Sequence, residues 1–280
     1  MYIFKEIHSL QLHLEAEKKA GRTVGFVPTM GALHDGHISL ITAAREQSDV
    51  VVCSIFVNPT QFNDPKDYEK YPITINEDVS KLVAAGTDVL FLPTVAEMYP
   101  EGVHGEHRHY DFGYLETVLE GAHRPNHFQG VGIIVHKLLE IVQPTGLFMG
   151  QKDFQQCMIV KKLLEITQMP VNLVICATRR ETDGLAMSSR NMRLSADERK
   201  LATAIYNVLV GLKQNIGSTP LPDLKQNAIL ALEKQGFLVD YIEVADANNL
   251  RVVSAPIPEG MVALAAAKLN EVRLIDNMLL

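Results

Sequence analysis

The chain of 280 residues, with a mass of 31.1 kDa, is long enough for one large domain or two modest ones with a buried core. Its 47% hydrophobic and 21% charged residues, with a mean hydropathy of +0.05, exclude a disordered or fibrous chain. The 33 acidic residues outnumber the 26 Lys and Arg residues, and the net charge of −7 disfavours a protein that binds nucleic acid through excess positive charge.

Helix-like and strand-like segments alternate through the first two thirds of the chain. Helical spacing of apolar residues occurs at 6–20, around 40–44, and at 76–85, 131–142 and 153–167. Apolar strand-like runs lie between them, at Thr23–Val27 (closed by Pro28), Val50–Val57, Asp88–Leu92, Leu147–Met149 and Val171–Cys176. Continuous apolar strands separated by amphipathic helices are typical of a parallel sheet covered on both faces. We therefore predict an α/β, Rossmann-like domain over residues 1–180.

The last third of the chain has a different pattern. Ser195 and Glu198 have the spacing of a capping box, which predicts a long helix from Ser195 to about Gln214. The stretch 217–222 interrupts it, and a second helix is expected to run to about Gln235. Strand-like runs follow at Phe237–Val244, Met261–Ala267 and Val272–Ile275. Helices followed by consecutive strands predict a smaller α+β domain over residues 181–280.

Features of secreted and membrane proteins are missing from the sequence. No apolar run approaches the roughly 20 residues of a membrane-spanning helix, and the N-terminal segment lacks the apolar region of a signal peptide. The three cysteines, Cys53, Cys157 and Cys176, lie far apart among apolar neighbours and are interpreted as reduced core thiols. We expect a cytoplasmic protein without a membrane partner. His104, His107 and His109 are interpreted as part of a solvated loop rather than a metal site.

The segment from Pro28 to His37 (PTMGALHDGH) carries the strongest chemical signal. It follows a buried strand and begins a helix, and ligands bind at such turns in open α/β sheets. A helix N-terminus presents unpaired N–H groups and partial positive charge, which suits phosphate. His34 and His37 can add two further donors, and Gly36 lets a bulky ligand approach the backbone. A zinc site is the alternative, but no third ligand has suitable spacing.

A second strand-to-helix turn follows Met149. Lys152 places a mobile cation where a polyphosphate needs one. The side chains of Gln155 and Gln156 point in neighbouring directions from the first turn of the predicted helix. One of them is therefore expected to face a cleft and the other the core. The alternative is an ordinary Lys-Asp helix start.

Two further segments carry polar side chains suited to anions or hydroxyl groups. In 183–191 (DGLAMSSRN), two serines and an arginine offer hydrogen-bond donors to phosphate oxygens, although a polar linker is the alternative. In 57–63 (VNPTQFN), side-chain amides follow a strand and can bind a hydroxylated acid, although turn formation explains them equally well.

Taken together, these segments and LEGAHRPNHFQGV at 119–131 resemble the pantoate–β-alanine ligase family. That family belongs to the nucleotidyltransferases with a His-x-Gly-His (HIGH) motif. The resemblance covers nearly the whole chain, and five ordered segments are more specific than the motif alone. It implies condensation of (R)-pantoate with β-alanine at the expense of ATP, through a pantoyl adenylate, in pantothenate and coenzyme A biosynthesis. It also implies Mg²⁺, a C-terminal lid domain and a homodimer.

The resemblance assigns roles to individual residues. It implies that Gln61 and Gln156 bind pantoate and that Gln61 also lies near β-alanine. The candidate catalytic residues are His34, His37, Lys152, Ser188, Ser189 and Arg190, and no metal ligand is assigned. The residues expected to contact ATP are Met30, Gly31, Ala32, Leu33, His34, Asp35, Gly36, His37, Gly150, Gln151, Lys152, Asp153, Arg179, Met187, Ser188, Ser189 and Arg190.

Two positions depart from the family pattern. Gln129 stands where the family usually has Arg, and Arg179 stands where an apolar residue is frequent beside the adenine pocket. Two other functions remain open on the sequence. One is a different HIGH-motif nucleotidyltransferase that adenylylates a small cofactor precursor, and the other is a catalytically silent ATP or pantoate sensor.

Overall fold

The computed structural model describes residues 1–62, 68–103, 105, 108–258 and 260–280. It forms two compact units, Met1–Gly150 with Gln156–Cys176, and Gln151–Gln155 with Ala177–Leu280. The last change of unit, at Ala177, lies near the predicted division at residues 180 and 181. The prediction did not place Gln151–Gln155 in the second unit, where the structure has them. Asn63, His104 and His107 lie outside the described residues.

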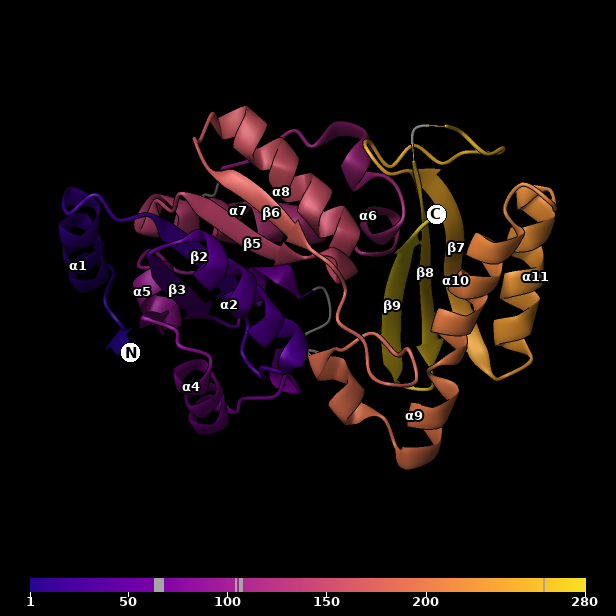
Figure 1. Ribbon diagram of the computed structural model, residues 1–280, viewed down its shortest axis with the longest axis horizontal. Helices are drawn as coiled ribbons and strands as arrows, with labels where there is room; N and C mark the ends of the chain where they lie inside the picture. The colour runs from indigo at the N-terminus through magenta and orange to yellow at the C-terminus, as the bar shows by residue number, and fades with distance from the viewer. Residues whose placement is uncertain (63–67, 104, 106–107, 259) are drawn as a thin grey trace. The chain divides into compact units, whose positions relative to one another are not determined.

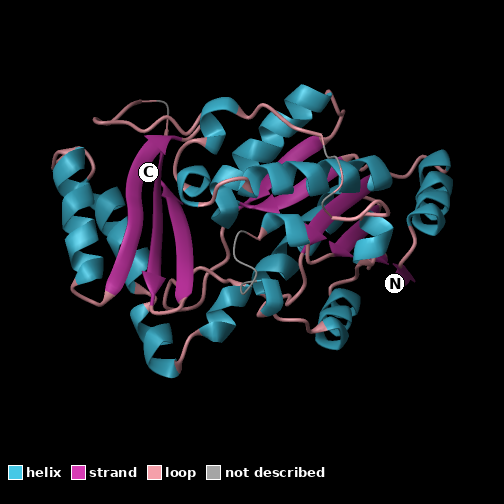
Figure 2. Cartoon of the chain, turned by 180° about the vertical axis from the view of Figure 1, so that it is seen from behind, coloured by secondary structure: helices cyan, strands magenta, loops and turns pink. Residues whose placement is uncertain are grey.

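The first unit is built on a six-stranded parallel sheet with the strand order β1-β4-β3-β2-β5-β6. Helices cover its two faces (Figures 1 and 2), with α2 packed on β2 and β3 beside α4, whereas α1 packs with α7. The predicted fold class is confirmed. The strands are β1 Tyr2–Phe4, β2 Val24–Thr29, β3 Val50–Ile55, β4 Val89–Phe91, β5 Gly146–Gly150 and β6 Asn172–Cys176. The helices are α1 Ile7–Lys19, α2 Asp35–Gln47, α4 Ile75–Ala84, α5 Val95–Met98, α6 Glu120–His123, α7 His127–Val142 and α8 Phe154–Thr167, which begins in the second unit.

The strand order places a switch point between β2 and β5. Counted from β2, the strands lie in the order third, second, first, fourth, fifth, which is the doubly wound arrangement. Ligands of such sheets bind outside the carboxyl ends of the strands at the switch point. β2 leads there into the segment around His34 and His37, and β5 ends there at Gly150.

Two details of the sheet differ from the sequence prediction. β1 was not predicted, because three residues are too few to show the alternation of hydrophobic and polar residues that is typical of a strand. They form a strand only by pairing with β4. β2 does not close before Pro28 but continues to Thr29, with Pro28 opposite Ser54 of β3. The pairing of β2 with β5 stops at Phe26, so the missing N–H of Pro28 interrupts no bond on that side.

The three cysteines are free thiols in the structure. Cys53 is completely buried between sheet and helix, beside Val27, Leu40 and Leu90. Burial raises the pKa of its thiol to about 12, so it stays protonated and unreactive at neutral pH. Its role is therefore packing. Within the described residues, no helix is both long and apolar enough to cross a bilayer.

The second unit packs helices against a three-stranded antiparallel sheet with the order β7-β8-β9. Helices α10 and α11 lie side by side along this sheet (Figure 1), α11 on β7 and α10 on β8 and β9. The buried faces are apolar, for example the run Met261–Ala267 of β8. The elements are α9 Ala196–Leu201, α10 Ala204–Asn215, α11 Leu221–Glu233, β7 Phe237–Asp246, β8 Met261–Leu269 and β9 Val272–Leu279.

The single long helix predicted from Ser195 to about Gln214 is wrong, because it divides into α9 and α10. The predicted capping box does form, since Ser195 Oγ accepts from the Glu198 N–H and the Glu198 carboxylate accepts from the Ser195 N–H. The break lies at residues 202–203. There the Thr203 hydroxyl donates to the Lys200 carbonyl (2.8 Å), and the Ile205 N–H donates three residues back, to Ala202. A hydroxyl that binds a helix carbonyl tightens and bends the helix at that point.

Candidate functional site

His34 and His37 form the N-terminal cap of α2. His34 is the N-cap residue, and its Nδ1 accepts from the Gly36 N–H (3.1 Å). His37, three residues later, accepts from the His34 N–H through its own Nδ1 (3.3 Å). The two rings are 4.0 Å apart between centroids. The pair therefore makes a capping box from imidazoles in place of the usual hydroxyl and carboxylate.

These hydrogen bonds determine what the rings can offer to a ligand. A ring nitrogen that accepts from a backbone N–H carries no proton, so the neutral ring holds its proton on the other nitrogen. We assign the Nε2–H tautomer to both His34 and His37 on this basis. Each histidine is then a hydrogen-bond donor beside the positive end of the α2 dipole. This arrangement suits a phosphate or another anion.

Asp78 of α4 holds the loop that leads into the histidines. Its carboxylate is fully buried and accepts from the N–H groups of Ala32 (2.9 Å) and Leu33 (2.7 Å). Thr74 Oγ1 donates to the same carboxylate (3.2 Å), and Lys81 donates to the Leu33 carbonyl. Both oxygens of the Asp78 carboxylate bind the loop, so Asp78 positions the backbone next to His34.

The loop itself has a tight backbone. Gly31 has a φ of +83°, and a Cβ on it would lie 3.2 Å from Asp78 Oδ2 and 3.1 Å from Ile55 Cγ2. Ala32 follows with a φ of 50°, also in the left-handed region. This conformation is unfavourable for a residue with a Cβ. The two hydrogen bonds to Asp78 stabilise it.

Gln61 ends a 3₁₀ turn, Pro59–Gln61, that lies against α7. Its carbonyl accepts from Arg124 (3.4 Å) and lies 2.8 Å from His127 Nδ1. A Cβ on Gly130 of α7 would lie 2.2 Å from the Thr60 carbonyl oxygen, so only glycine allows this contact. The backbone of Gln61 is thus held on two sides. This is the rigidity that a substrate-orienting amide requires.

The glutamines at the start of α8 differ in burial. Gln155 is buried, with 3% of its surface exposed, and Gln156 is only half-buried. Gln156 belongs to the first unit with Gln61, whereas Gln155 belongs to the second.

Lys152 lies in a single 3₁₀ turn, Gln151–Asp153, of the second unit. Its side chain is 16% exposed, and its ammonium lies 3.6 Å from the Asp153 carboxylate. Asp153 is about half exposed, so this ion pair is solvated and weak. An anionic ligand can therefore compete for the Lys152 cation at little cost.

The serine–arginine segment follows a short hairpin. The Met187 N–H donates to the Arg179 carbonyl (3.0 Å), Arg180 and Ala186 form a bridge, and the side chain of Arg179 is exposed. Ser188 caps the next 3₁₀ turn, Ser189–Arg193, by accepting from the Arg190 N–H (3.3 Å). A hydroxyl that accepts in this way still has its proton to donate. Capping and phosphate binding are therefore compatible at Ser188.

We expect Gly184→Ala to destabilise the second unit. Gly184 has a φ of +92°, and a Cβ on it would lie 2.2 Å from the ring of Tyr206. Overpacking of this kind costs about 1–3 kcal/mol. The matched control is Gly217→Ala, because Gly217 has a similar φ of +90° but nothing within 4 Å. Urea denaturation should show the larger loss of unfolding free energy for Gly184→Ala, and equal losses would contradict the clash.

Gln129, the first departure from the family pattern, is fully used within its own unit. Its amide donates to the Tyr110 carbonyl (2.7 Å) and to Glu116 (2.8 Å), and its oxygen accepts from the Tyr110 N–H (3.1 Å). These bonds fasten the segment around Tyr110 to α7. In this chain the position therefore has a structural role.

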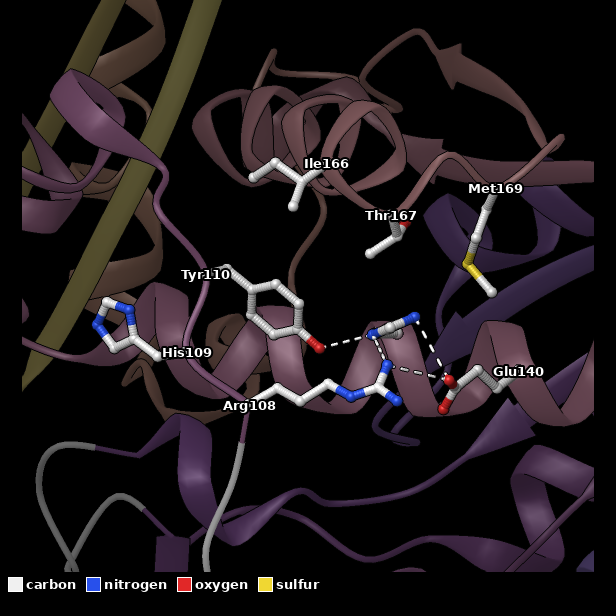
Figure 3. Close-up of a pocket in the computed structure, with 8 residues that line it drawn as sticks. Arg108, His109, Tyr110, Glu140, Ile166, Thr167 and Met169 are labelled. Atoms are coloured by element: carbon white, nitrogen blue, oxygen red, sulfur yellow. Dashed lines mark hydrogen bonds and ion pairs between the residues drawn. The ribbon is translucent and has the colours of Figure 1, made fainter.

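A hollow of about 600 Å³ in the first unit has none of the predicted site residues in its wall. Four of its polar side chains, those of Arg108, Tyr110, His136 and Glu140, contact one another (Figure 3). Tyr110 Oη lies 2.6 Å from His136 Nδ1, and Arg108 contacts both His136 and Glu140. Burial lowers the pKa of His136 and raises that of Tyr110, so both are neutral at pH 7. None of the predicted site residues lines this hollow, so we do not assign the site to it.

The structure divides the predicted site residues between the two units. The first unit holds Met30–His37, Gln61, Gly150 and Gln156, and the second holds Gln151–Asp153, Arg179 and Met187–Arg190. The convergence of the two sets on one ligand stays a prediction. Asp78 was missed as a positioning residue, although its place in the first turn of a helix preceding a strand was visible in the sequence. Among the described residues, no three His, Cys, Asp or Glu side chains gather to hold a metal ion.

Comparison with known proteins gives a consistent result over the whole chain. The family model described as pantoate-beta-alanine ligase matches residues 2–279. A pantothenate synthetase of Cytophaga hutchinsonii is 42% identical over 100% of this chain and 99% of its own length. One of Alcanivorax borkumensis is 47% identical over 95% of this chain and 93% of its own length.

Solved structures agree with the sequence relatives. A crystal structure of pantothenate synthetase from Thermus thermophilus has a TM-score of 0.93, with 38% identity over 99% of both chains. Pantoate-beta-alanine ligase from Francisella tularensis, complexed with beta-gamma ATP and beta-alanine, has a TM-score of 0.84. It is 36% identical and covers 100% of this chain and 97% of its own.

Proposed function

The chain belongs to the pantoate–β-alanine ligase family, and from that membership we infer that it joins (R)-pantoate to β-alanine at the expense of ATP. The products are pantothenate, AMP and pyrophosphate. The observation that carries this inference is the match over residues 2–279 together with relatives at 42–47% identity. The F. tularensis relative, complexed with a form of ATP and β-alanine, supports both as ligands.

The reaction needs ATP because a carboxylate is a poor electrophile toward an amine. We propose that the pantoate carboxylate attacks the α-phosphorus of ATP and that pyrophosphate leaves. The β-alanine amine then attacks the carbonyl carbon of the pantoyl adenylate, and AMP leaves. In the first step negative charge develops on the α-phosphate oxygens, where donors already in place stabilise it without reorganisation.

We propose that His34 and His37 supply two of these donors through their Nε2–H groups. Their Nδ1 atoms are engaged by the backbone, so neither ring can turn without breaking the cap of α2. Lys152, Ser188, Ser189 and Arg190 of the second unit are the remaining candidates. The protein carries a net charge of −7, so the attraction for two anionic substrates must come from these local groups.

We propose Mg²⁺ as the companion of ATP. Magnesium keeps most of its waters and is held by substrate phosphates with one or two carboxylates, so it needs no cluster of protein ligands. Asp153, about half exposed beside Lys152, fits that requirement. When bound, the ion neutralises charge on the phosphate oxygens of the leaving pyrophosphate. The Lys152 ammonium and the histidine N–H groups bind and orient the nucleotide.

We propose that Gln61 and Gln156 orient pantoate. Both lie in the first unit, and the backbone of Gln61 is clamped by Arg124 and the neighbourhood of His127. Gln61→Ala is expected to raise the Michaelis constants for pantoate and β-alanine by about tenfold, the loss of one or two neutral hydrogen bonds. Unchanged constants in steady-state assays would overturn this assignment. Gln143→Ala, at the distant end of α7, is the control.

One experiment separates this function from its rivals. AMP and pyrophosphate are measured with ATP and pantoate, with and without β-alanine. The ligase releases stoichiometric AMP only when the amine is present. A nucleotidyltransferase that keeps AMP in its product releases pyrophosphate without AMP, and a silent sensor releases neither. Turnover without pantoate would contradict the proposal.

We also propose that the protein is a cytoplasmic homodimer, as the family resemblance implies. Light scattering after size-exclusion chromatography measures the mass directly.

A further inference from the structure

The Lys152 turn belongs to the second unit because strand β9 holds it there. The Asn277 side chain donates from Nδ2 to the carbonyls of Gln151 (2.9 Å) and Lys152 (2.8 Å). Its Oδ1 accepts from Gln151 Nε2 (3.2 Å). Asn277 is 2% exposed. Both hydrogens of the Asn277 amide group are thus donated to backbone carbonyls of one turn.

The preceding residue of β9 holds the hairpin that leads to the serines. The buried Asp276 carboxylate makes two bonds with the Arg180 guanidinium (2.6 and 3.0 Å). Arg180 also donates to the carbonyls of Gly184 and Asn277 (3.0 Å each) and lies over the ring of Tyr206. Burial raises the pKa of Asp276, and Arg180 opposes that shift. This pair connects β9 to the hairpin 179–187 at Arg180 and at the Gly184 carbonyl.

Two adjacent residues therefore connect both cationic segments of the second unit. The Asp276 carboxylate also accepts from the Asn277 N–H (2.7 Å), which links the two networks. Buried polar side chains cost free energy unless they are fully hydrogen-bonded. Asp276 uses its hydrogen bonds on the hairpin before Ser188, and Asn277 uses its own on the Lys152 turn.

We propose that Asn277 is a positioning residue for the ligase reaction, acting through the backbone of the Lys152 turn. Together with the Asp276–Arg180 pair, it keeps Lys152 and the serine–arginine segment in one rigid set of phosphate donors. A displacement of about 1 Å in such a group can cost about 10²-fold in rate. The proposal rests on the proposed function, because it assigns Lys152 to the triphosphate.

The test is a double-mutant cycle in the full-length protein, read by pantoate-dependent exchange of labelled pyrophosphate into ATP. We expect Asn277→Ala to lower the exchange rate about 10- to 100-fold, with the Michaelis constant for pantoate unchanged, since Gln61 and Gln156 lie in the other unit. We expect Lys152→Ala to lower it about 10²–10³-fold. In the double variant the two losses should combine to much less than their product, because Asn277 acts mainly by positioning Lys152.

A purely structural role for Asn277 predicts a different pattern. The losses in exchange rate of the two single variants would then multiply in the double variant, or the Michaelis constant for pantoate would rise as the exchange rate falls. Either result overturns the proposal. Asn215→Asp is the matched control. Asn215 also donates to a carbonyl (Gly211, 2.8 Å) in the same unit but is exposed at the end of α10. It should lose less than twofold in exchange rate.

A second variant covers the case in which Asn277→Ala does not fold, and the unmodified protein tests the proposed function itself. If Asn277→Ala does not fold, Asn277→Ser replaces it in the cycle, because a hydroxyl retains one donor to the turn. It should recover part of the exchange rate, and additivity with Lys152→Ala would still reject the proposal. If the unmodified protein shows no pantoate-dependent exchange, the proposed function fails. If the unmodified protein is active but the effects of the Asn277 and Lys152 substitutions are additive, the proposed function stands and only the role of Asn277 is rejected.

Discussion

Replacement of His37 by Ala is expected to lower the rate of pantoyl adenylate formation about 10²–10³-fold, the usual loss for one preorganised donor to a developing oxyanion. The reason lies in the α2 cap, where His37 Nδ1 accepts from the His34 N–H and leaves Nε2–H as the donor. The fold should persist, because the loss of one capping interaction costs only about 1 kcal/mol. Pyrophosphate exchange measures the first half-reaction and circular dichroism the fold.

A second substitution separates capping from donation. In His37→Asn, the side-chain oxygen lies close to where Nδ1 was and can still accept from His34, but nothing replaces Nε2–H. We expect this variant to regain stability without regaining rate. His8→Ala is the control, because His8 is an exposed histidine of α1. Near-normal exchange in His37→Asn would show that the histidine only caps the helix, and the donor role would be withdrawn.

Replacement of Asp78 by Asn is expected to damage both stability and rate, although Asp78 is not expected to touch substrate. The carboxylate accepts from two adjacent backbone N–H groups, Ala32 and Leu33. Asn has one acceptor oxygen, so its amide group must face one of these donors. Leaving a buried donor unsatisfied costs about 1–3 kcal/mol. The loop before His34 should shift, and a misplacement of about 1 Å lowers the rate about 10²-fold.

Urea denaturation and pyrophosphate exchange measure the two effects of Asp78→Asn. Glu77→Gln is the matched control, since it makes the same chemical change one residue away on the exposed face of α4. It should leave both measurements near those of the unmodified protein. A stable and fully active Asp78→Asn variant would mean that the loop conformation does not depend on this carboxylate.

The order and type of most elements follow from the sequence because they depend on local pattern. The apolar run at 50–57 predicts a buried strand, and its residues 50–55 form β3, which is fully buried. The periodic segment at 131–142 forms most of α7. The Ser195–Glu198 capping box forms because it needs only residues three apart. The break after Leu201 escaped prediction because a hydroxyl–carbonyl bond at Thr203 competes with a pattern that is helical throughout.

The candidate site also has features that follow from the sequence and features that only the folded chain shows. Sequence by itself determined the chemistry: two histidines at a helix start, a lysine turn and a serine–arginine segment in an order typical of one ligase family. Only the tertiary structure decided what holds these groups. Asp78 lies 46 residues from Ala32, and Asn277 lies 125 residues from Lys152. Both act through hydrogen bonds to main-chain groups, and a main-chain N–H or carbonyl is the same at every residue. No pattern of side chains can therefore reveal such partners until the chain has folded.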